Sequence, residues 1–249
     1  MKDAKETRLL ERPLALALPE DAIVRLVGPA MTCTGTVIED DMILTAHHCV
    51  VQRGSKGEFE KTLLEPSAIK VELGGDYFAW GEVGVKFVVA PDVGEKGGGG
   101  DVAVLVLTRK LVGLSTMKPR LDKAPKIGEE VQPVGFGRCA LSADAIRRKD
   151  RDGGSIRAIT SETLHVEASI CPGDSGGPVF AKGTRDIIGV VSTSAMDHDE
   201  RTRGPSVMAR LDAYRCVFER ASLLAQGWPQ NELPPLDCAG PPSPSPKQK

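Results

Sequence analysis

The stretch Cys171-Pro172-Gly173-Asp174-Ser175-Gly176-Gly177-Pro178 is the most informative part of this sequence. A serine hydroxyl is a poor nucleophile at neutral pH, so a catalytic serine needs a base for its proton and donors for the oxyanion that follows. Glycines on both sides of Ser175 allow the backbone angles that would expose the N–H groups of Gly173 and Ser175 beside the hydroxyl. A chance match to the whole octet is improbable, so we expect Ser175 to be a nucleophile.

Two other segments offer the groups that such a serine needs. The segment Leu44–Cys49, LTAHHC, carries His47 and His48 at the end of an apolar strand. The segment Gly100–Leu107, GDVAVLVL, places Asp101 directly before an aliphatic strand. An acid in that position is partly buried, where an unpaired charge is costly, so it should have a hydrogen-bond partner. His48 is the natural partner of Asp101.

Most of the remaining chain reads as short strands separated by Gly, Pro and Asp, which predicts an all-β protein. Closing the sheets into barrels would keep so many strand edges from pairing with other chains. The segment Asp212–Gln226 is the exception, because its apolar residues recur at helical spacing and Gly227 supplies a stop. The expected strands are Ala22–Val27, Thr36–Ile38, Met42–Thr45, Ile69–Leu73, Val83–Val89, Val102–Leu107, Val131–Phe136, Thr163–Glu167, Ile187–Ser192 and Val207–Leu211.

Composition excludes several other classes of protein. The chain has 249 residues, 41% hydrophobic and 27% charged, which fits a globular protein rather than a disordered one. A formal charge of −2 gives no field that would attract nucleic acid or an anionic membrane. No apolar stretch approaches the roughly 18 to 20 residues of a transmembrane helix. The amino terminus lacks a secretory signal, so either a leader has been removed or the protein is not exported.

With its three motifs the chain resembles the trypsin/chymotrypsin-type serine endopeptidases, as a divergent, bacterial-style member. The strings TAHHC, GDVAVLVL and CPGDSGGP match the histidine, aspartate and serine boxes of that family, in the same order. The resemblance implies two antiparallel six-stranded β-barrels with the active site between them. The expected organisation is an N-terminal segment 1–21, a first barrel 22–112, a second barrel 113–211, a C-terminal helix 212–226 and an extension with a disordered tail 227–249.

The resemblance also assigns roles to individual residues. Ser175 would be the nucleophile, His48 the general base and then general acid, and Asp101 the group that orients His48. The N–H groups of Gly173 and Ser175 would form the oxyanion hole. The family usually has alanine where this chain has His47, and the effect of that departure is left open.

The same resemblance indicates which residues would form the specificity pocket. Ser169 corresponds to the pocket floor, where trypsin-like members carry aspartate, so a Lys or Arg side chain would find no carboxylate. Ser194 and Ser206 correspond to wall positions that are glycine in members with deep pockets, and Ser192 lies in the same stretch. We therefore expect small or medium uncharged residues before the scissile bond.

Many family members mature by a cleavage that frees an Ile-Val-Gly-Gly terminus, whose ammonium pairs with the acid before the serine, here Asp174. No such string precedes Ala22. Either cleavage near Arg8 or Arg12 releases another apolar terminus, or Asp174 has a different donor and no cleavage is needed. The segment Arg147–Asp152 is expected to be a solvated charged loop.

Six cysteines allow 15 pairings, and bridges would indicate an oxidising compartment. The resemblance implies a bridge that staples the histidine loop and makes two further pairings plausible. The expected pairs are Cys33–Cys49, Cys139–Cys171 and Cys216–Cys238. We accordingly expect a secreted or periplasmic monomer that takes a protein or peptide substrate and a protein inhibitor.

Other interpretations of these motifs are weaker. His47, His48 and Cys49 have no C-x-x-C or H-E-x-x-H companion, so we expect no metal and no cofactor. The glycines of Gly97–Gly100 lack the Lys and Ser/Thr of a phosphate-binding loop. An esterase elbow does not fit, because a strand-like run follows Ser175 where the elbow needs a helix. A catalytically silent binding protein of the same fold is the competing function.

Overall fold

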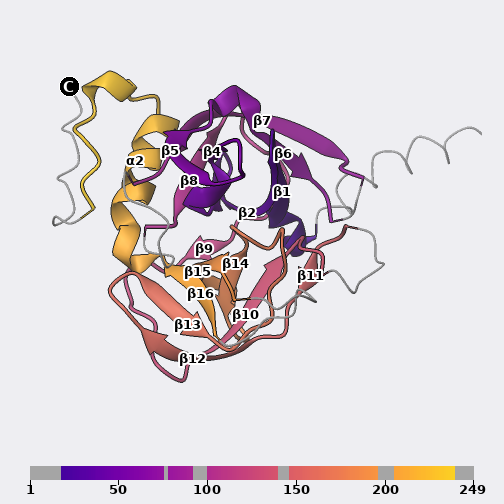
Figure 1. Cartoon of the computed structure of the whole chain (residues 1–249). Helices are drawn as coiled ribbons and strands as arrows, with labels where there is room; N and C mark the ends of the chain where they lie inside the picture. Colours follow the sequence, from indigo (N-terminus) through magenta and orange to yellow (C-terminus); the bar gives the residue numbers. More distant parts are fainter. Residues whose placement is uncertain (1–17, 76–77, 92–99, 140–145, 196–204, 239–249) are drawn as a thin grey trace, which may run out of the picture.

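Two closed barrels of antiparallel strands form most of the protein in this computed structural model, which describes residues 18–75, 78–91, 100–139, 146–195 and 205–238 (Figure 1). The predicted all-β class, the two six-stranded barrels and the helix near the carboxyl end are confirmed. Residues 1–17 of the predicted N-terminal segment and residues 239–249 of the predicted extension and tail, 227–249, lie outside the described residues.

The first barrel closes in the order β1-β2-β3-β8-β7-β6. Its strands β3 and β8 are aliphatic and buried along their whole length. They pair antiparallel with Thr45 opposite Ala103, so the end of β3 lies beside the start of β8. This register brings the histidine segment next to Asp101. The strands are β1 (Ile23–Gly28), β2 (Met31–Glu39), β3 (Met42–Thr45), β6 (Lys70–Leu73), β7 (Gly81–Val89) and β8 (Ala103–Leu107).

The second barrel runs in the order β10-β12-β13-β16-β15-β14 and is closed by the pairing of β10 with β14. Two short strands extend it, since β11 pairs with β10 and β9 lies parallel to β15. The strands are β9 (Lys118–Pro119), β10 (Glu130–Gly135), β11 (Lys149–Asp150), β12 (Gly154–Ile159), β13 (Thr163–Val166), β14 (Pro178–Ala181), β15 (Asp186–Thr193) and β16 (Ser206–Arg210).

A small hairpin stands beside the first barrel and was not predicted from the sequence. It consists of β4 (Val51–Arg53) and β5 (Phe59–Leu63), which pair only with each other. The residues of β5 are mostly exposed and polar, so they show no alternation of buried and exposed positions. The hairpin follows the short 3-10 turn His47–Cys49 and therefore lies close to the histidines.

The carboxyl-terminal helix packs on the first barrel, although it follows the second in sequence (Figure 1). The predicted range 212–226 divides into a 3-10 turn, Asp212–Tyr214, and the α-helix α2, Arg215–Ala225. Its apolar face, which includes Val217, Phe218 and Leu224, is buried against β7 and β8. Within the described chain, no helix has both the length and the apolar character needed to cross a membrane.

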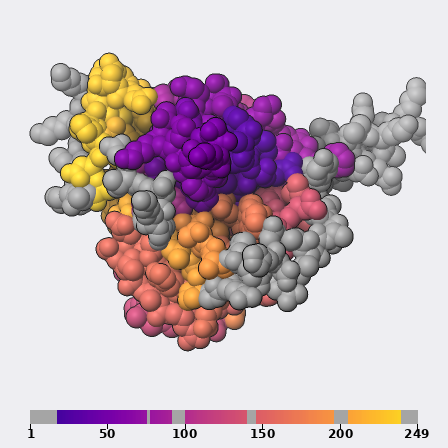
Figure 2. All heavy atoms as spheres, viewed as in Figure 1, coloured from indigo at the N-terminus to yellow at the C-terminus, as the bar shows by residue number. Residues whose placement is uncertain are grey.

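Two clusters of buried apolar residues form the core, and one of them extends across both barrels. One cluster of buried residues runs from the first barrel through α2 to second-barrel residues such as Phe136 and Ile187. A second cluster, which includes Ile156 and Met208, fills the interior of the second barrel. Figure 2 shows the two halves as blocks of colour, indigo to magenta and salmon to orange, that meet across the middle of the molecule.

Candidate active site

His48 is held by Asp101 through two contacts at the edge of the first barrel. The backbone N–H of His48 donates to Asp101 Oδ1 at 2.8 Å, and His48 Nδ1 lies 2.8 Å from Asp101 Oδ2. An ionised carboxylate can only accept, so Nδ1 carries the proton and Nε2 of the neutral ring is left as an acceptor. This is the tautomer that a general base requires.

Asp101 is only 1% exposed, yet its surroundings favour the ionised form. Burial by itself would raise the pKa of Asp101. The His48 ring, the Ser192 hydroxyl and the backbone N–H of His48 outweigh that effect and hold the pKa below its ordinary value. Ser192 donates to Asp101 Oδ2 at 2.5 Å. Ser192 therefore supports the acid, a role that the sequence did not reveal.

Ser175 sits on a glycine-rich turn of the second barrel that leads into β14. The carbonyl of Ser175 accepts a 2.8 Å hydrogen bond from the N–H of Thr34, a residue of the first barrel. Gly176 has φ +81°, and a Cβ there would collide with the Thr45 hydroxyl and the Thr34 carbonyl. The glycine is thus required both by its backbone angle and by the close approach of the other barrel.

Thr34 joins the serine turn to the first barrel. Its hydroxyl donates to the Gly173 carbonyl at 2.8 Å and accepts from the N–H of Phe136 at 3.0 Å. Its own carbonyl accepts from the Thr45 hydroxyl at 2.9 Å. Thr34 is fully buried, and these bonds fix the turn that carries Gly173 and Ser175. No sequence motif marks this residue.

A cavity of about 350 Å³ opens between the barrels and is lined by both His48 and Ser175. Among the described residues the Ser175 hydroxyl makes no hydrogen bond to the His48 ring. Catalytic hydrogen bonds often tighten only when substrate binds. The lining residues are Ala30, Met31, Thr32, Cys33, His48, Arg53, Phe59, Ile170, Cys171, Pro172, Gly173, Ser175, Ser192, Thr193 and Ser194.

The four serines predicted to form the specificity pocket occupy different places. Ser192 and Ser194 line the cavity. Ser206 is buried beside it, donates to the Ala168 carbonyl at 2.7 Å and lies 3.1 Å from the Ser194 hydroxyl. Ser169 is exposed and does not belong to the cavity lining. Residues 196–204, which follow Ser194, lie outside the described residues.

Asp174 is fully buried next to Ser175 and already has a cationic partner, Arg151. The N–H groups of Gly137 and Cys171 also donate to it, at 2.7 and 2.8 Å. A Cβ at Gly137 would meet this carboxyl at 2.6 Å, so only glycine permits the approach. The prediction of a solvated loop at 147–152 is wrong for Arg151 and also for Arg148, whose side chain is largely buried and paired with Asp21.

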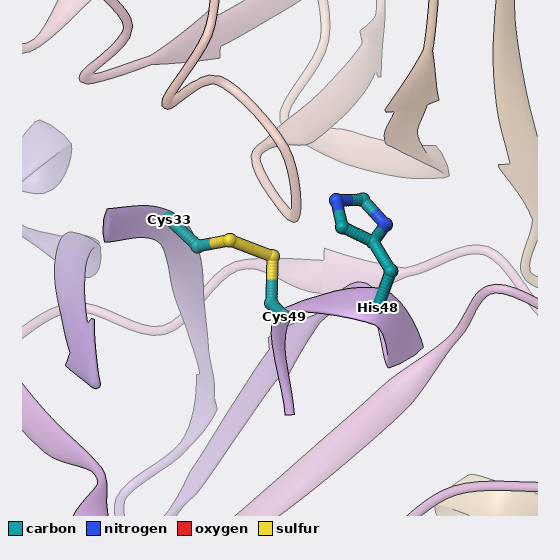
Figure 3. A group of neighbouring side chains, drawn as sticks. All are labelled: Cys33, His48 and Cys49. Carbon is teal, nitrogen blue, oxygen red and sulfur yellow. A yellow bond between two sulfur atoms is a disulfide. The ribbon is translucent and has the colours of Figure 1, made fainter. Parts of the chain in front are cut away.

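All three predicted disulfides are present, with Cys139 bridged to Cys171 and Cys216 to Cys238. The third, Cys33–Cys49, lies beside His48 (Figure 3). These three side chains bring potential ligand atoms within 4.8 Å of one another, as a metal site would. Both sulfurs are consumed by the disulfide, however, and a metal needs the free thiolate. The cluster therefore serves as a staple for the histidine turn.

A family model described as Trypsin matches residues 19–217. No curated protein matches the sequence. Among solved structures, the scabies mite inactivated protease paralogue S-D1 has a TM-score of 0.66 at 18% identity, covering 84% of this chain and 94% of that one. Paralogue S-I1 from the same mite scores 0.62 at 18% identity, with coverage of 81% and 94%. A mutant of human heparin binding protein scores 0.67 at 16% identity, with coverage of 85% and 95%. At such identities these structures establish the shared fold alone.

Proposed function

Because this chain belongs to the trypsin family, we propose that it is a serine endopeptidase whose triad is Ser175, His48 and Asp101. One observation carries the proposal. The His48 ring is fixed by a buried carboxylate on its Nδ1 side and faces a cavity that Ser175 also lines. That is the arrangement a general base needs in order to activate a neighbouring hydroxyl.

In the proposed reaction the Ser175 hydroxyl attacks the carbonyl carbon of the peptide bond while His48 Nε2 accepts its proton. The N–H groups of Gly173 and Ser175 stabilise the oxyanion, and the histidine then gives its proton to the departing amine. Water activated by His48 hydrolyses the acyl-enzyme.

We propose a preference for small or medium uncharged side chains before the scissile bond. No carboxylate is among the described residues that line the cavity, so a Lys or Arg side chain would find no counter-ion there. Ser192 and Ser194 line the cavity with short, uncharged polar side chains. A fluorogenic peptide panel should show fastest hydrolysis after residues such as Ala or Val. A clear preference for Arg would contradict this assignment.

A catalytically silent binding protein is the second candidate. Two of the similar solved structures bear the description of inactivated protease paralogues. This chain retains all three residues of the proposed triad, with Asp101 and His48 in contact. Hydrolysis of a peptide substrate that is lost in Ser175→Ala favours the enzyme, whereas equal and negligible turnover in both proteins favours the silent alternative.

We also propose that the protein works as a monomer in an oxidising space, either secreted or periplasmic. Support comes from the disulfides, which persist in such compartments and are rare in the cytosol. Its partners would be a protein or peptide substrate and a protein inhibitor. Light scattering of the oxidised protein measures its molar mass in solution and so tests whether it is a monomer.

A further inference from the structure

Asp174 places a buried negative charge beside the proposed nucleophile. Its carboxylate has no exposed surface and lies one residue from Ser175, where an uncompensated charge would be costly. Two backbone N–H groups, from Gly137 and Cys171, bond one to each oxygen. Hydrogen bonds alone leave the charge without a cation.

Arg151 supplies that cation from within the second barrel. One terminal nitrogen donates to Asp174 Oδ1 at 2.9 Å, and Nε makes an ion-pair contact of 2.7 Å with Oδ2. The same terminal nitrogen also donates to the Gly137 carbonyl. The backbone N–H of Arg151 donates to the Pro133 carbonyl at 2.9 Å, so the side chain starts from an anchored backbone just after β11.

The carboxylate of Asp174 accepts three hydrogen bonds and makes one further ion-pair contact, with the Nε of Arg151. A carboxylate offers about four acceptor sites, two on each oxygen. Oδ1 meets the Gly137 N–H and an Arg151 terminal nitrogen, and Oδ2 meets the Cys171 N–H and the Arg151 Nε. An ammonium group from a newly cut chain end would therefore have to compete with the Arg151 guanidinium, which already neutralises this buried charge.

We propose that Arg151 is the permanent counter-ion of Asp174, and that it keeps the serine turn formed without any cleavage near Arg8 or Arg12. This inference rests on the proposed endopeptidase function. Arg151 would be a positioning residue, because it touches Asp174 rather than the substrate. Its loss should tilt the Gly173 and Ser175 N–H groups away from the oxyanion, lowering kcat by about 10²- to 10³-fold with little change in KM.

The test compares kcat and KM of the full chain carrying Arg151→Ala or Arg151→Lys. Arg151→Lys should recover part of kcat, and added methylguanidinium should recover part of the kcat of Arg151→Ala. Arg148→Ala is the matched control, since it removes a neighbouring arginine that pairs with Asp21 instead. A protein with both Arg8→Ala and Arg12→Ala should be fully active at its uncut mass.

Two results would overturn the proposal: normal kcat in Arg151→Ala, or a wild-type chain that gains activity only after cleavage near Arg8 or Arg12. If Arg151→Ala does not fold, the kcat of Arg151→Lys and the activity of the uncut Arg8→Ala/Arg12→Ala protein still test the proposal. A wild type that is inert both intact and cleaved refutes the proposed function instead. In that case a double-mutant cycle of Arg151→Met and Asp174→Asn in thermal unfolding still measures the coupling energy between the two side chains. Absence of coupling would refute the role of Arg151 as counter-ion.

A second, independent feature lies on the hairpin β4–β5, which carries Arg53 and Phe59 into the wall of the same cavity. The Arg53 guanidinium stacks 3.5 Å from the centroid of the Phe59 ring. Phe59 in turn packs edge-on against the His48 ring, with centroids 5.4 Å apart, and remains 38% exposed. An exposed aromatic ring and a cation thus stand beside the reacting groups.

Arg53 has unused capacity for hydrogen bonds. Within the described chain it donates only to the Gly57 carbonyl, at 3.2 Å, and its Nε is buried with no partner. No acidic residue acts on it there, and burial lowers the pKa of its guanidinium from the ordinary value. A partly desolvated arginine without a carboxylate is suited to bind one from a ligand.

We infer that Arg53 binds a carboxylate of the substrate on the leaving-group side of the scissile bond. The acyl side is assigned to the lining formed by Ile170, Ser192 and Ser194. The remaining lining, which includes Ala30–Cys33 and the hairpin residues Arg53 and Phe59, is left for the departing part. The carboxylate could belong to an Asp or Glu side chain or to the chain end of a short peptide.

Quenched peptides with Glu, Gln or Lys after the scissile bond, each with a free or amidated carboxyl end, separate these sources. Wild type should prefer Glu over Gln, or the free end over the amide, by about 10-fold in kcat/KM, the size expected of a charge-assisted hydrogen bond. Arg53→Met should abolish that ratio, whereas the exposed control Arg109→Met should keep it. Equal ratios in wild type and Arg53→Met, or a preference for Lys, would overturn the subsite. Failure to cut any peptide would refute the endopeptidase itself.

Discussion

At the scale of single residues, Asp101 has one hydrogen-bond partner that the sequence motifs predict and another that they do not. Its pairing with His48 could be predicted, because both belong to strings that match known boxes. The Ser192 hydroxyl, which also donates to Asp101, comes from a position 91 residues away. A serine in an apolar strand gives no periodic signal, so its contact with Asp101 emerges only when the barrels are assembled.

Replacement of Ser192 by alanine should weaken catalysis without unfolding the protein. The substitution removes a hydrogen bond to a buried carboxylate, which is worth about 1.5–3 kcal/mol. We expect kcat/KM to fall by about 10- to 100-fold, as the His48–Asp101 pair loses support. Ser194→Ala is the control, because Ser194 lines the same cavity without contacting Asp101. Comparable losses in both variants would contradict the role given to Ser192.

The lowered pKa of Asp101 also predicts how stability depends on pH. A carboxyl with a depressed folded pKa stabilises the protein above its unfolded value of about 3.9, and this stabilisation is lost as pH falls through the folded pKa. Asp101→Asn should therefore be less stable than wild type at neutral pH, by a margin that shrinks below about pH 4. Denaturant unfolding at several pH values measures this. A margin independent of pH would show that Asp101 does not titrate as described.

At the scale of secondary-structure elements, aliphatic patterns predicted the buried strands β3 and β8 and the alternating strand β7, and missed the mostly exposed hairpin β4–β5. Met42–Thr45 is identical to β3, whereas the hairpin β4–β5 was missed. The hairpin pairs with no other strand, and two of its residues, Arg53 and Phe59, line the cavity beside His48. Arg53 and Phe59 therefore could not be recognised from the sequence.

Two of the disulfides constrain different parts of the fold, so their removal should have different effects. Cys33–Cys49 closes a separation of 16 residues around the histidine turn, and its loss should cost about 3 kcal/mol of stability. The double variant Cys33→Ala/Cys49→Ala should also lose activity at temperatures where wild type is active. Removing Cys216–Cys238, which ties α2 to the segment after it, should lower the melting temperature but leave kcat unchanged. Equal kcat in the two variants would contradict this difference.

At the scale of the whole molecule, the two barrels meet at the site that needs residues from both. Thr34 of the first barrel bonds to Gly173 and Phe136 of the second, so its loss should disturb the serine turn. We expect Thr34→Val to lose about 1–3 kcal/mol of stability, through two unpaired backbone groups, and to lower kcat. Thr36→Val is a matched control, because the buried Thr36 hydroxyl has no hydrogen-bond partner in the described chain. If Thr36→Val were as damaging as Thr34→Val, the bonds of Thr34 would not be the cause.

Covalent labelling of Ser175 tests the central claim most directly, because it depends on the nucleophile, the base and the oxyanion turn together. A diphenyl phosphonate peptide with Ala or Val next to phosphorus should add one label to the oxidised full chain. Peptide mapping should find it on Ser175. His48→Ala should label far more slowly and Ser175→Ala not at all. A wild-type protein that remains unlabelled, or that is labelled elsewhere, would contradict the assignment of a Ser-His-Asp endopeptidase.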